Sequence, residues 1–296
     1  MYRFSPIVKT LVWGTESWVL SGVPGQESVV SEGPQAGRKV TDLFPGPFPL
    51  LVKFIRSERD TSVQVHPDDA LAAARHGASG KTEMWYVAGA SEGAKLLCGL
   101  KAPLTPESFD RLVAADRITE VLAEHSVAPG DVFFLPPGRI HAIGGGCLLV
   151  EVQQASDITY RIYDYRRPGL DGKPRPLHLE QAREAIDYTV YPEYKLRYEP
   201  RQDAPVELVA CPFFSTTLYD LTRRAEIGPR HSGPAPESPA FLALVGLAGE
   251  GVVRTAADET VLRPGEAVLI PAPEGMASVL PGDGGLRLLA VRPAGV

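Results

Sequence analysis

Short apolar segments bounded by Gly, Pro or Asp recur along the first half of the chain. They are rich in β-branched and aromatic residues, which is typical of β-strands. The segments lie at residues 49–55, 61–66, 83–89, 94–100, 131–136, 147–154 and 158–165. The pattern therefore predicts a mainly β protein in which turns join short strands.

The segment at residues 61–66 alternates strictly between apolar and polar side chains. In a strand, Ser62, Gln64 and His66 then share one face, while the two valines between them point to the other. The valines are predicted to be core. Burying an amide or an imidazole without a partner costs about 1–3 kcal/mol, so we expect other polar or charged groups to meet this face.

Three segments carry helix signals instead. Pro67 is predicted to open a helix at its first position, and Gly77 is predicted to end it. A second helix is predicted from Thr105 towards Glu124, and a third at residues 179–188. The predicted fold therefore contains only a few short helices.

One motif occurs twice, at a constant offset of 135 residues. Residues 129–143 read PGDVFFLPPGRIHAI, and residues 264–278 read PGEAVLIPAPEGMAS. Both copies begin with Pro-Gly and an acidic residue, continue as an apolar strand and reach a proline, which predicts two related β-modules. Met276 stands where the first copy has His141, so the chemistry is expected in the first module.

Composition narrows the class of protein. Of the 296 residues, 44% are apolar and 22% are charged, which is ordinary for a globular protein. The net charge is −6 and no Lys/Arg tract stands out, which argues against nucleic acid as a partner. Three scattered cysteines without a C-x-x-C spacing argue against a disulfide framework or a thiolate zinc site. The sequence shows neither a signal peptide nor a membrane span, so a cytoplasmic protein is expected.

Four polar residues of the first module are candidate metal ligands: Gln64, His66, Glu83 and His141. We expect them to converge on the interior of a β-barrel. Two imidazoles, one carboxylate and one amide suit Zn²⁺, Fe²⁺ or Mn²⁺. Two alternatives stay open: each histidine is a hydrogen-bonded structural residue, or Gln64 orients a ligand without binding the ion.

A polar, proline-containing segment at residues 191–203 marks the expected junction between the modules. We expect residues 1–200 to form a catalytic, metal-binding domain that includes the short helices. Residues 201–296 are expected to form a second domain that lacks metal ligands and has a structural role. His231 of this second domain is predicted to lie in a loop.

Charged residues near the candidate ligands suggest how an anionic substrate is held. Arg161 lies among apolar and aromatic residues, so it is either paired with Glu151 or a clamp for an oxyanion or phosphate. Lys81 is either a cation of the site or a solvated loop residue. Arg166 and Arg167 are either phosphate ligands or surface residues.

Four motifs together resemble those of mannose-6-phosphate isomerases, specifically the short bacterial form. The motifs are SVQVHPDD at residues 62–69, GKTEMWYV at 80–87, PGRIHAIGGG at 137–146 and EVQQASDITYRIYDY at 151–165. The resemblance extends from the N-terminal WG…ESW to about Tyr194. One departure is VWGTESWVLSG at residues 12–22, where the family often has a second Gly and a longer loop.

The resemblance implies a cupin-type fold, mainly β, with two cupin-like jelly-roll or barrel modules. It also implies one zinc ion per chain, for which Fe²⁺ and Mn²⁺ stay open as alternatives. By the same resemblance His66, Glu83 and His141 are the metal ligands, and Gln64 is an additional amide ligand.

The resemblance further implies an interconversion of mannose 6-phosphate and fructose 6-phosphate through a cis-enediol. Arg161 corresponds to the active-site arginine, Glu151 to a carboxylate that transfers protons, and Lys81 to the basic residue before the ligand glutamate. The residues expected to contact the substrate are Ser62, Arg166 and Arg167.

Two other functions stay open on the sequence alone. One is a cupin-like sensor that binds a sugar phosphate without turnover, and the other is an iron-dependent cupin dioxygenase. The complete ligand set argues against the sensor, and nothing in the sequence requires the open metal positions that O₂ needs. The predicted partner is a small phosphosugar, with neither nucleic acid nor a membrane, and the oligomeric state is not predicted.

Overall fold

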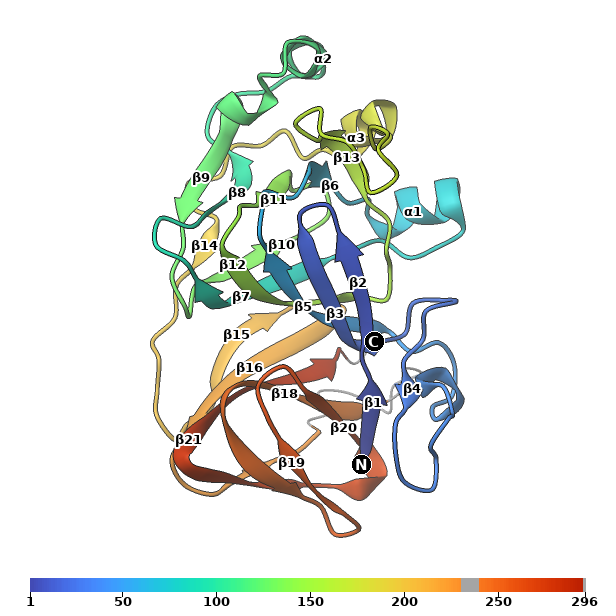
Figure 1. The fold of residues 1–296 in the computed structure, drawn as a ribbon, viewed down its shortest axis with the longest axis vertical. Helices are drawn as coiled ribbons and strands as arrows, with labels where there is room; N and C mark the ends of the chain where they lie inside the picture. The colour runs from blue at the N-terminus through green and yellow to red at the C-terminus, as the bar shows by residue number, and fades with distance from the viewer. Residues whose placement is uncertain (230–239, 295–296) are drawn as a thin grey trace. The chain divides into compact units, whose positions relative to one another are not determined.

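The computed structural model describes residues 1–229 and 240–294, and strands dominate it (Figure 1). The chain divides into two compact units. The terminal unit comprises Met1–Ile7, Trp18–Lys53 and Arg197–Val296, and the central unit comprises Val8–Ser17 and Phe54–Leu196. The mainly β fold with a few short helices is confirmed. The domain limits expected near residue 200 remain a prediction, and His231 lies outside the described residues.

Two sheets build the central unit (Figure 1). The larger has the strand order β14-β10-β7-β12-β5-β3-β2. Its strands are β2 (Ile7–Leu11), β3 (Gly14–Ser21), β5 (Leu50–Ser57), β7 (Glu83–Ala90), β10 (Val132–Leu135), β12 (Cys147–Gln154) and β14 (Lys195–Leu196). The boundary between the units falls within β3 and β5. Only Val12 and Trp13 join β2 to β3, and the stretch from Gly14 to Trp18, where the family often has a longer loop, lies within β3.

The smaller sheet has the strand order β13-β6-β11-β8-β9. Its strands are β6 (Val63–Val65), β8 (Lys95–Leu100), β9 (Leu122–Ser126), β11 (His141–Ile143) and β13 (Tyr160–Tyr163). All seven strands predicted from the apolar segments are observed, in β5, β6, β7, β8, β10, β12 and β13. The short strand β11 was not predicted, because proline and glycine precede it and only three residues take part.

The interior of the central unit is an apolar cluster drawn from both sheets. Trp85, Phe133 and Leu149 come from the larger sheet, and Leu96 and Ile143 come from the smaller one. All five side chains are at most 2% exposed. Alternate positions of the same strands therefore point into a shared interior, as in a closed or sandwiched β-module.

Helix α1 (Asp69–His76) begins later than predicted. Asp68 is the N-cap, and its side chain accepts a hydrogen bond from the backbone N–H of Leu71 at 2.8 Å. A capping aspartate satisfies a helix N–H that otherwise has no partner, so the helix starts after it rather than at Pro67. Gly77 ends the helix with φ of 61°, as predicted.

Helix α2 (Pro106–Ala114) is shorter than predicted. Thr105 caps it, but the chain then forms the 3₁₀ turn η2 (Ile118–Val121) and continues as β9. Hydrogen bonding of β9 to β8 therefore overrides the helical pattern that runs towards Glu124. The third predicted helix, α3 (Leu179–Ala185), is observed and ends slightly earlier.

Helices cover the outer face of the smaller sheet. Val63 and Val65 are fully buried in a cluster with Phe109 of α2 and Ala182 of α3. The prediction that these valines are core is confirmed. Because side chains alternate along β6, Gln64 points to the opposite face, into the interior of the unit.

The terminal unit is built on a nine-stranded sheet with the order β15-β16-β21-β18-β20-β1-β4, where β17 pairs with β21 and β19 with β18. Its strands are β1 (Tyr2–Ser5), β4 (Val29–Val30), β15 (Val206–Ala210), β16 (Phe214–Leu221), β17 (Ala225–Ile227), β18 (Phe241–Arg254), β19 (Glu259–Leu262), β20 (Ala267–Pro271) and β21 (Ala277–Pro293). Two short 3₁₀ turns, η1 (Val40–Asp42) and η3 (Ala272–Glu274), complete it.

The repeated motif forms the same local structure in both units. A Pro-Gly turn leads into β10 in one copy and into β20 in the other, and each strand reaches its proline. Met276 is 54% exposed. In the described part of the chain, a group of His, Cys, Asp or Glu that fits a metal ion occurs only in the central unit.

All three cysteines are free, in agreement with the prediction against a disulfide framework. Cys98 and Cys147 are buried, and Cys211 is partly exposed. Among residues 1–229 and 240–294, no helix has the length and apolar character needed to span a membrane.

Candidate metal centre and active site

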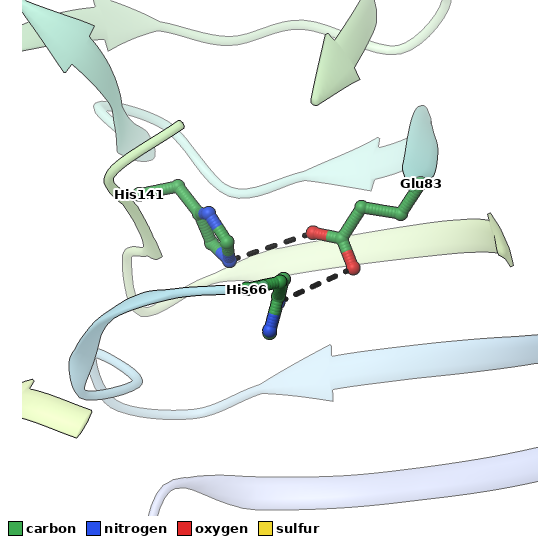
Figure 2. Close-up of side chains that lie close together, drawn as sticks. All are labelled: His66, Glu83 and His141. Atoms are coloured by element: carbon green, nitrogen blue, oxygen red, sulfur yellow. Dashed lines mark ion pairs between the residues drawn. The ribbon is translucent and has the colours of Figure 1, made fainter. Parts of the chain in front are cut away.

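His66, Glu83 and His141 lie together in the interior of the central unit, with their side chains pointing toward one another (Figure 2). His66 directly follows β6, Glu83 begins β7 and His141 begins β11. The three residues are 2%, 0% and 1% exposed, in that order. Their potential ligand atoms all lie within 4.8 Å of one another, so the fold gathers these side chains from three separate segments.

Backbone carbonyl groups set the tautomer of both histidines. The Nδ1 atom of His66 lies 2.9 Å from the carbonyl oxygen of Ile158, and that of His141 lies 2.9 Å from the carbonyl oxygen of Arg139. A carbonyl oxygen only accepts hydrogen bonds, so Nδ1 carries the proton and Nε2 of the neutral ring carries a lone pair. Both Nε2 atoms face Glu83, His66 at 3.5 Å from Oε2 and His141 at 3.4 Å from Oε1.

This donor set fits a divalent metal ion. Tetrahedral ligands at about 2.0–2.1 Å from zinc lie about 3.3–3.4 Å from one another. The two nitrogen–oxygen separations, 3.4 and 3.5 Å, are close to that value. Metal-binding histidines usually donate their other ring N–H to a carbonyl or carboxylate group that orients the ring, as both histidines do here. Two imidazoles and a carboxylate also suit Fe²⁺ and Mn²⁺, so the donors do not select one metal.

Gln64 lies beside these three residues. Its Nε2 is 3.1 Å from Nε2 of His141, and its Oε1 accepts a hydrogen bond from the Ser62 hydroxyl at 3.3 Å. In this orientation the amide nitrogen of Gln64 donates to the imidazole of His141. The amide oxygen would face the three candidate ligands only after the amide rotates by 180°. The Ser62 hydroxyl both donates and accepts, and it therefore suits either orientation.

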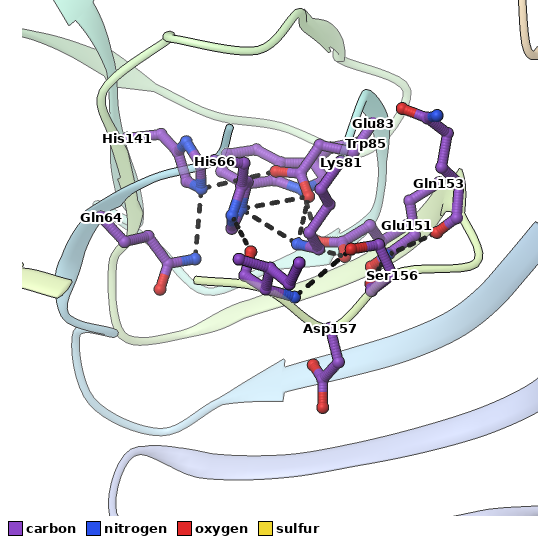
Figure 3. A network of polar contacts seen from close by, with 12 residues as sticks. Gln64, His66, Lys81, Glu83, Trp85, His141, Glu151, Gln153, Ser156 and Asp157 are labelled. Atoms are coloured by element: carbon purple, nitrogen blue, oxygen red, sulfur yellow. Dashed lines mark hydrogen bonds and ion pairs between the residues drawn. The ribbon is translucent and has the colours of Figure 1, made fainter. Parts of the chain in front are cut away.

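A buried lysine connects the three residues to a second carboxylate (Figure 3). Nζ of Lys81 donates to Oε2 of Glu83 at 2.6 Å and lies 3.0 Å from Nε2 of His66. The same ammonium group is 3.6 Å from Oε1 of Glu151. Lys81 is only 3% exposed, which excludes the alternative of a solvated loop residue.

Glu151 of β12 is held by a residue that the sequence analysis did not select. Its Oε2 accepts a hydrogen bond of 2.7 Å from the indole N–H of Trp85 on β7. The Trp85 ring also meets the ring of His141 edge to face, with 5.2 Å between the centroids. The position of Trp85, two residues after Glu83, was the available signal, since it places both side chains on one face of β7.

Arg161 extends a row of polar residues across the smaller sheet. Gln64 is directly opposite His141 on one side and Arg161 on the other, so the three side chains share a face. Nη1 of Arg161 donates to the carbonyl oxygen of Pro176 at 2.8 Å. In the described ranges no ion pair joins Arg161 to Glu151, so that alternative is not observed.

Two further arginines surround a buried aspartate near Arg161. Asp164 accepts hydrogen bonds from Nε of Arg167 at 2.9 Å and from Nε of Arg175 at 2.7 Å. Burial raises the pKa of Asp164, but the hydrogen bonds from Arg175 and Arg167 outweigh this effect and lower the pKa below its usual value. Burial, followed by the positive charge of Arg175, lowers the pKa of Arg161. Arg175 was also missed, because the loop that carries it has no periodic pattern.

Arg166 and Arg167 are neighbours in the sequence but differ in position. Arg167 bonds to Asp164, whereas the side chain of Arg166 is 76% exposed and pairs with Asp116 at 2.5 Å. The φ angles of Tyr165 and Arg166 are 55° and 52°, a left-handed turn that is uncommon outside glycine. This turn leaves Arg166 at the surface and apart from the buried residues.

Comparison with known proteins gives consistent matches over most of the chain. The mannose-6-phosphate isomerase ManA of Bacillus subtilis is 31% identical over 298 residues, covering 90% of this chain and 92% of that protein. The mannose-6-phosphate isomerase of Streptococcus mutans is 33% identical over 268 residues, covering 86% and 82%. The crystal structure of the Bacillus subtilis mannose 6-phosphate isomerase has a TM-score of 0.85 and 26% identity, covering 98% of each chain.

No protein-family model matches the chain. The matches to individual proteins nevertheless exceed 30% identity over most of the length of both partners. The four sequence motifs and the mainly β structure agree with them. The chain belongs to the mannose-6-phosphate isomerase family.

Proposed function

We propose that the chain is a metal-dependent aldose–ketose isomerase that interconverts mannose 6-phosphate and fructose 6-phosphate through a cis-enediol. The observation that carries this proposal is the buried group of His66, Glu83 and His141, with the Nε2 atom of each histidine 3.4–3.5 Å from an oxygen of one carboxylate. The names of the related proteins supply the substrate. These three side chains are the proposed binding site for the metal ion on which such a reaction depends.

One zinc ion would be held by His66, Glu83 and His141. Gln64 would add its amide oxygen as a ligand after its side-chain amide rotates by 180°. When bound, the ion acts as a Lewis acid that makes the hydrogen next to a sugar carbonyl more acidic. Glu83 contributes one negative charge and the histidines are neutral donors. The ion and these ligands therefore keep a net positive charge, which favours an anion beside them. Fe²⁺ and Mn²⁺ are the alternatives.

Glu151 is the proposed base that moves the proton between C2 and C1. It is 3% exposed and lies next to Lys81, which also contacts the proposed ligands. General acid–base catalysis contributes about 10²–10⁴-fold, so stabilisation of the enediolate must supply much of the remaining acceleration. Arg161 and Lys81 are the cations of this chain proposed to stabilise that anion.

The phosphate group is proposed to lie near the arginines around Asp164. Arg161, Arg167 and Arg175 outnumber this single carboxylate, which leaves a local excess of positive charge for a phosphate. Of Arg166 and Arg167, Arg167 is the stronger candidate for binding the phosphate, because Arg166 is exposed and paired with Asp116.

Ser62 is also among the residues expected to contact the substrate, but its proposed effect on the substrate is indirect. It is 3% exposed and donates to Gln64, so we propose that it acts on the substrate by orienting that amide.

We also propose that the enzyme works in the cytoplasm on a free phosphosugar. Three free cysteines support a reducing compartment. The net charge of −6 without a basic tract gives no support for nucleic acid as a partner.

A coupled isomerase assay before and after chelation tests the proposed function. The untreated protein should convert mannose 6-phosphate, lose turnover when the metal is removed, and regain it when Zn²⁺ is added. A sensor would bind the sugar phosphate without turnover. Turnover that persists in metal-free protein with an intact circular dichroism spectrum would contradict the metal-dependent mechanism.

A further inference from the structure

We propose that Trp85 is a positioning residue that holds Glu151 in place for proton transfer. This inference rests on the proposed role of Glu151 as the base. The indole N–H of Trp85 donates to Oε2 of Glu151 at 2.7 Å, and the ring is fully buried (Figure 3). A buried hydrogen bond to a carboxylate is among the stronger ones in proteins.

Strand register places the two residues together. Trp85 of β7 lies directly opposite Glu151 of β12, and Glu83 lies directly opposite Gln153 in the same ladder. Positions two apart in a strand share a face, so one antiparallel pair presents both a proposed metal ligand and the proposed base. On its other side Trp85 lies opposite Phe133 of β10, and both belong to the buried core. Core packing therefore fixes the ring that holds Glu151.

The hydrogen bond distinguishes the two oxygens of Glu151. Oε2 is bound to the indole, and Oε1 is the oxygen that lies 3.6 Å from Nζ of Lys81, next to the proposed ligands. A carboxylate anchored through one oxygen loses most of its freedom to rotate, which keeps Oε1 turned toward Lys81 and available for proton transfer. The indole is a neutral donor. It therefore holds the carboxylate without adding another positive charge to those of Lys81 and the proposed metal ion.

The same ring also contacts a proposed metal ligand. Its edge-to-face contact with His141 has an interplanar angle of 84° and a centroid distance of 5.2 Å. Trp85 therefore touches one proposed ligand and the proposed base at once.

A purely structural role makes a different prediction. A buried indole N–H needs an acceptor, and Glu151 would then serve only to satisfy it. Loss of the bond would in that case lower stability and leave proton transfer unchanged. The proposed positioning role requires a specific slowing of the proton transfer.

The test compares zinc-loaded Trp85→Phe with Phe133→Leu, which removes core volume beside Trp85 but no bond to Glu151. For Trp85→Phe we expect kcat to fall about 10- to 100-fold with little change in KM. The primary isotope effect on kcat with mannose 6-phosphate deuterated at C2 should rise, because proton transfer becomes slower. Phe133→Leu should lose stability and keep the wild-type isotope effect. A wild-type kcat and isotope effect in Trp85→Phe would overturn the proposal.

Glu151→Gln separates this proposal from the proposed function. Normal turnover in Glu151→Gln would remove Glu151 as the base, and the inference about Trp85 with it. If Glu151→Gln is inactive while Trp85→Phe behaves as wild type, only the role of Trp85 is overturned.

A spectroscopic measurement covers the case in which Trp85→Phe does not fold. The chain has three tryptophans, so ¹⁵N-labelled tryptophan gives three indole N–H signals. We expect the signal of Trp85 to lie downfield, because its N–H bonds to a carboxylate, and to move upfield in Glu151→Gln while the other two stay. Three unmoved signals would show that the bond is absent in solution and would overturn the proposal.

Discussion

Lys81 and Glu83 form a buried ion pair in the interior of the central unit, with 2.6 Å between Nζ and Oε2. The same ammonium group lies 3.0 Å from His66 Nε2 and 3.6 Å from Glu151 Oε1. It therefore touches two proposed metal ligands and the proposed base. Buried carboxylates are costly without a compensating charge, so Lys81 offsets the charge of Glu83 and Glu151 in the absence of a metal ion.

Lys81→Met should destabilise the metal-free protein more than the metal-loaded protein. Removing one partner of a buried ion pair typically costs about 3–5 kcal/mol. A bound divalent ion supplies positive charge to Glu83, so the loss should be smaller after loading. Urea unfolding with and without Zn²⁺ measures both values. Lys95→Met is the control, because Lys95 pairs with Glu124 at the exposed surface, where a pair contributes about 0–1 kcal/mol. Equal losses in both forms would contradict this account.

Removal of a proposed histidine ligand should abolish metal binding. We expect His66→Ala and His141→Ala to retain little zinc, since each removes one of the two imidazoles from the proposed ligand set. His125→Ala is a matched control, because His125 bonds to the carbonyl oxygen of Cys98 and is not part of the group. Elemental analysis of the purified proteins measures the zinc content. Full zinc content in both variants at positions 66 and 141 would rule out the proposed site.

The strands were predictable because apolar alternation and turn residues are local signals. The strand at residues 61–66 also revealed a polar face, and the structure places Gln64 and His66 as that pattern requires. The end of α2 was not predictable in the same way. Pairing of β9 with β8 outweighs local helix propensity, and that pairing depends on residues far away in the sequence.

The contacts within the site depend on the register in which the strands pair, and this register cannot be read from the sequence. Trp85 and Glu151 are 66 residues apart, and they meet only because β7 and β12 pair in one particular register. The sequence could indicate which residue types were available, but not that Glu151 bonds to an indole instead of Arg161. Asp164 and Arg175 were missed for a different reason, since a loop without a periodic pattern brings them together.

Arg161→Ala should lower turnover and leave the metal content unchanged. Arg161 shares a sheet face with Gln64 and His141 but is not one of the proposed ligands. Loss of a group that stabilises a developing anion costs about 10²–10³-fold in kcat. Coupled assays and elemental analysis on the same preparation measure both quantities. Arg117→Ala is the control, because Arg117 forms an exposed ion pair with Glu120. Unchanged kcat in Arg161→Ala would refute the proposed role.

Asp164→Asn should destabilise the protein in a pH-dependent way. The folded-state pKa of Asp164 is lowered, because the hydrogen bonds from Arg175 and Arg167 outweigh the effect of burial. A depressed carboxyl pKa contributes stability above the unfolded-state value of about 3.9, and this contribution is lost as the pH falls through the folded-state value. Wild type should therefore exceed Asp164→Asn by about 1.5–3 kcal/mol near neutral pH, and the difference should shrink in acid below about pH 4.

Urea unfolding of both proteins between about pH 2 and pH 7 measures this difference. Asp171→Asn is the control, because Asp171 lies exposed in the same loop and bonds to the backbone N–H of Lys173. KM of Asp164→Asn should also rise, since Arg167 and Arg175 lose the carboxylate that orients them near the proposed phosphate site. A stability difference that stays constant down to the lowest pH would show that the charge of Asp164 does not hold these arginines. An unchanged KM alongside the expected pH dependence would confine the role of Asp164 to stability.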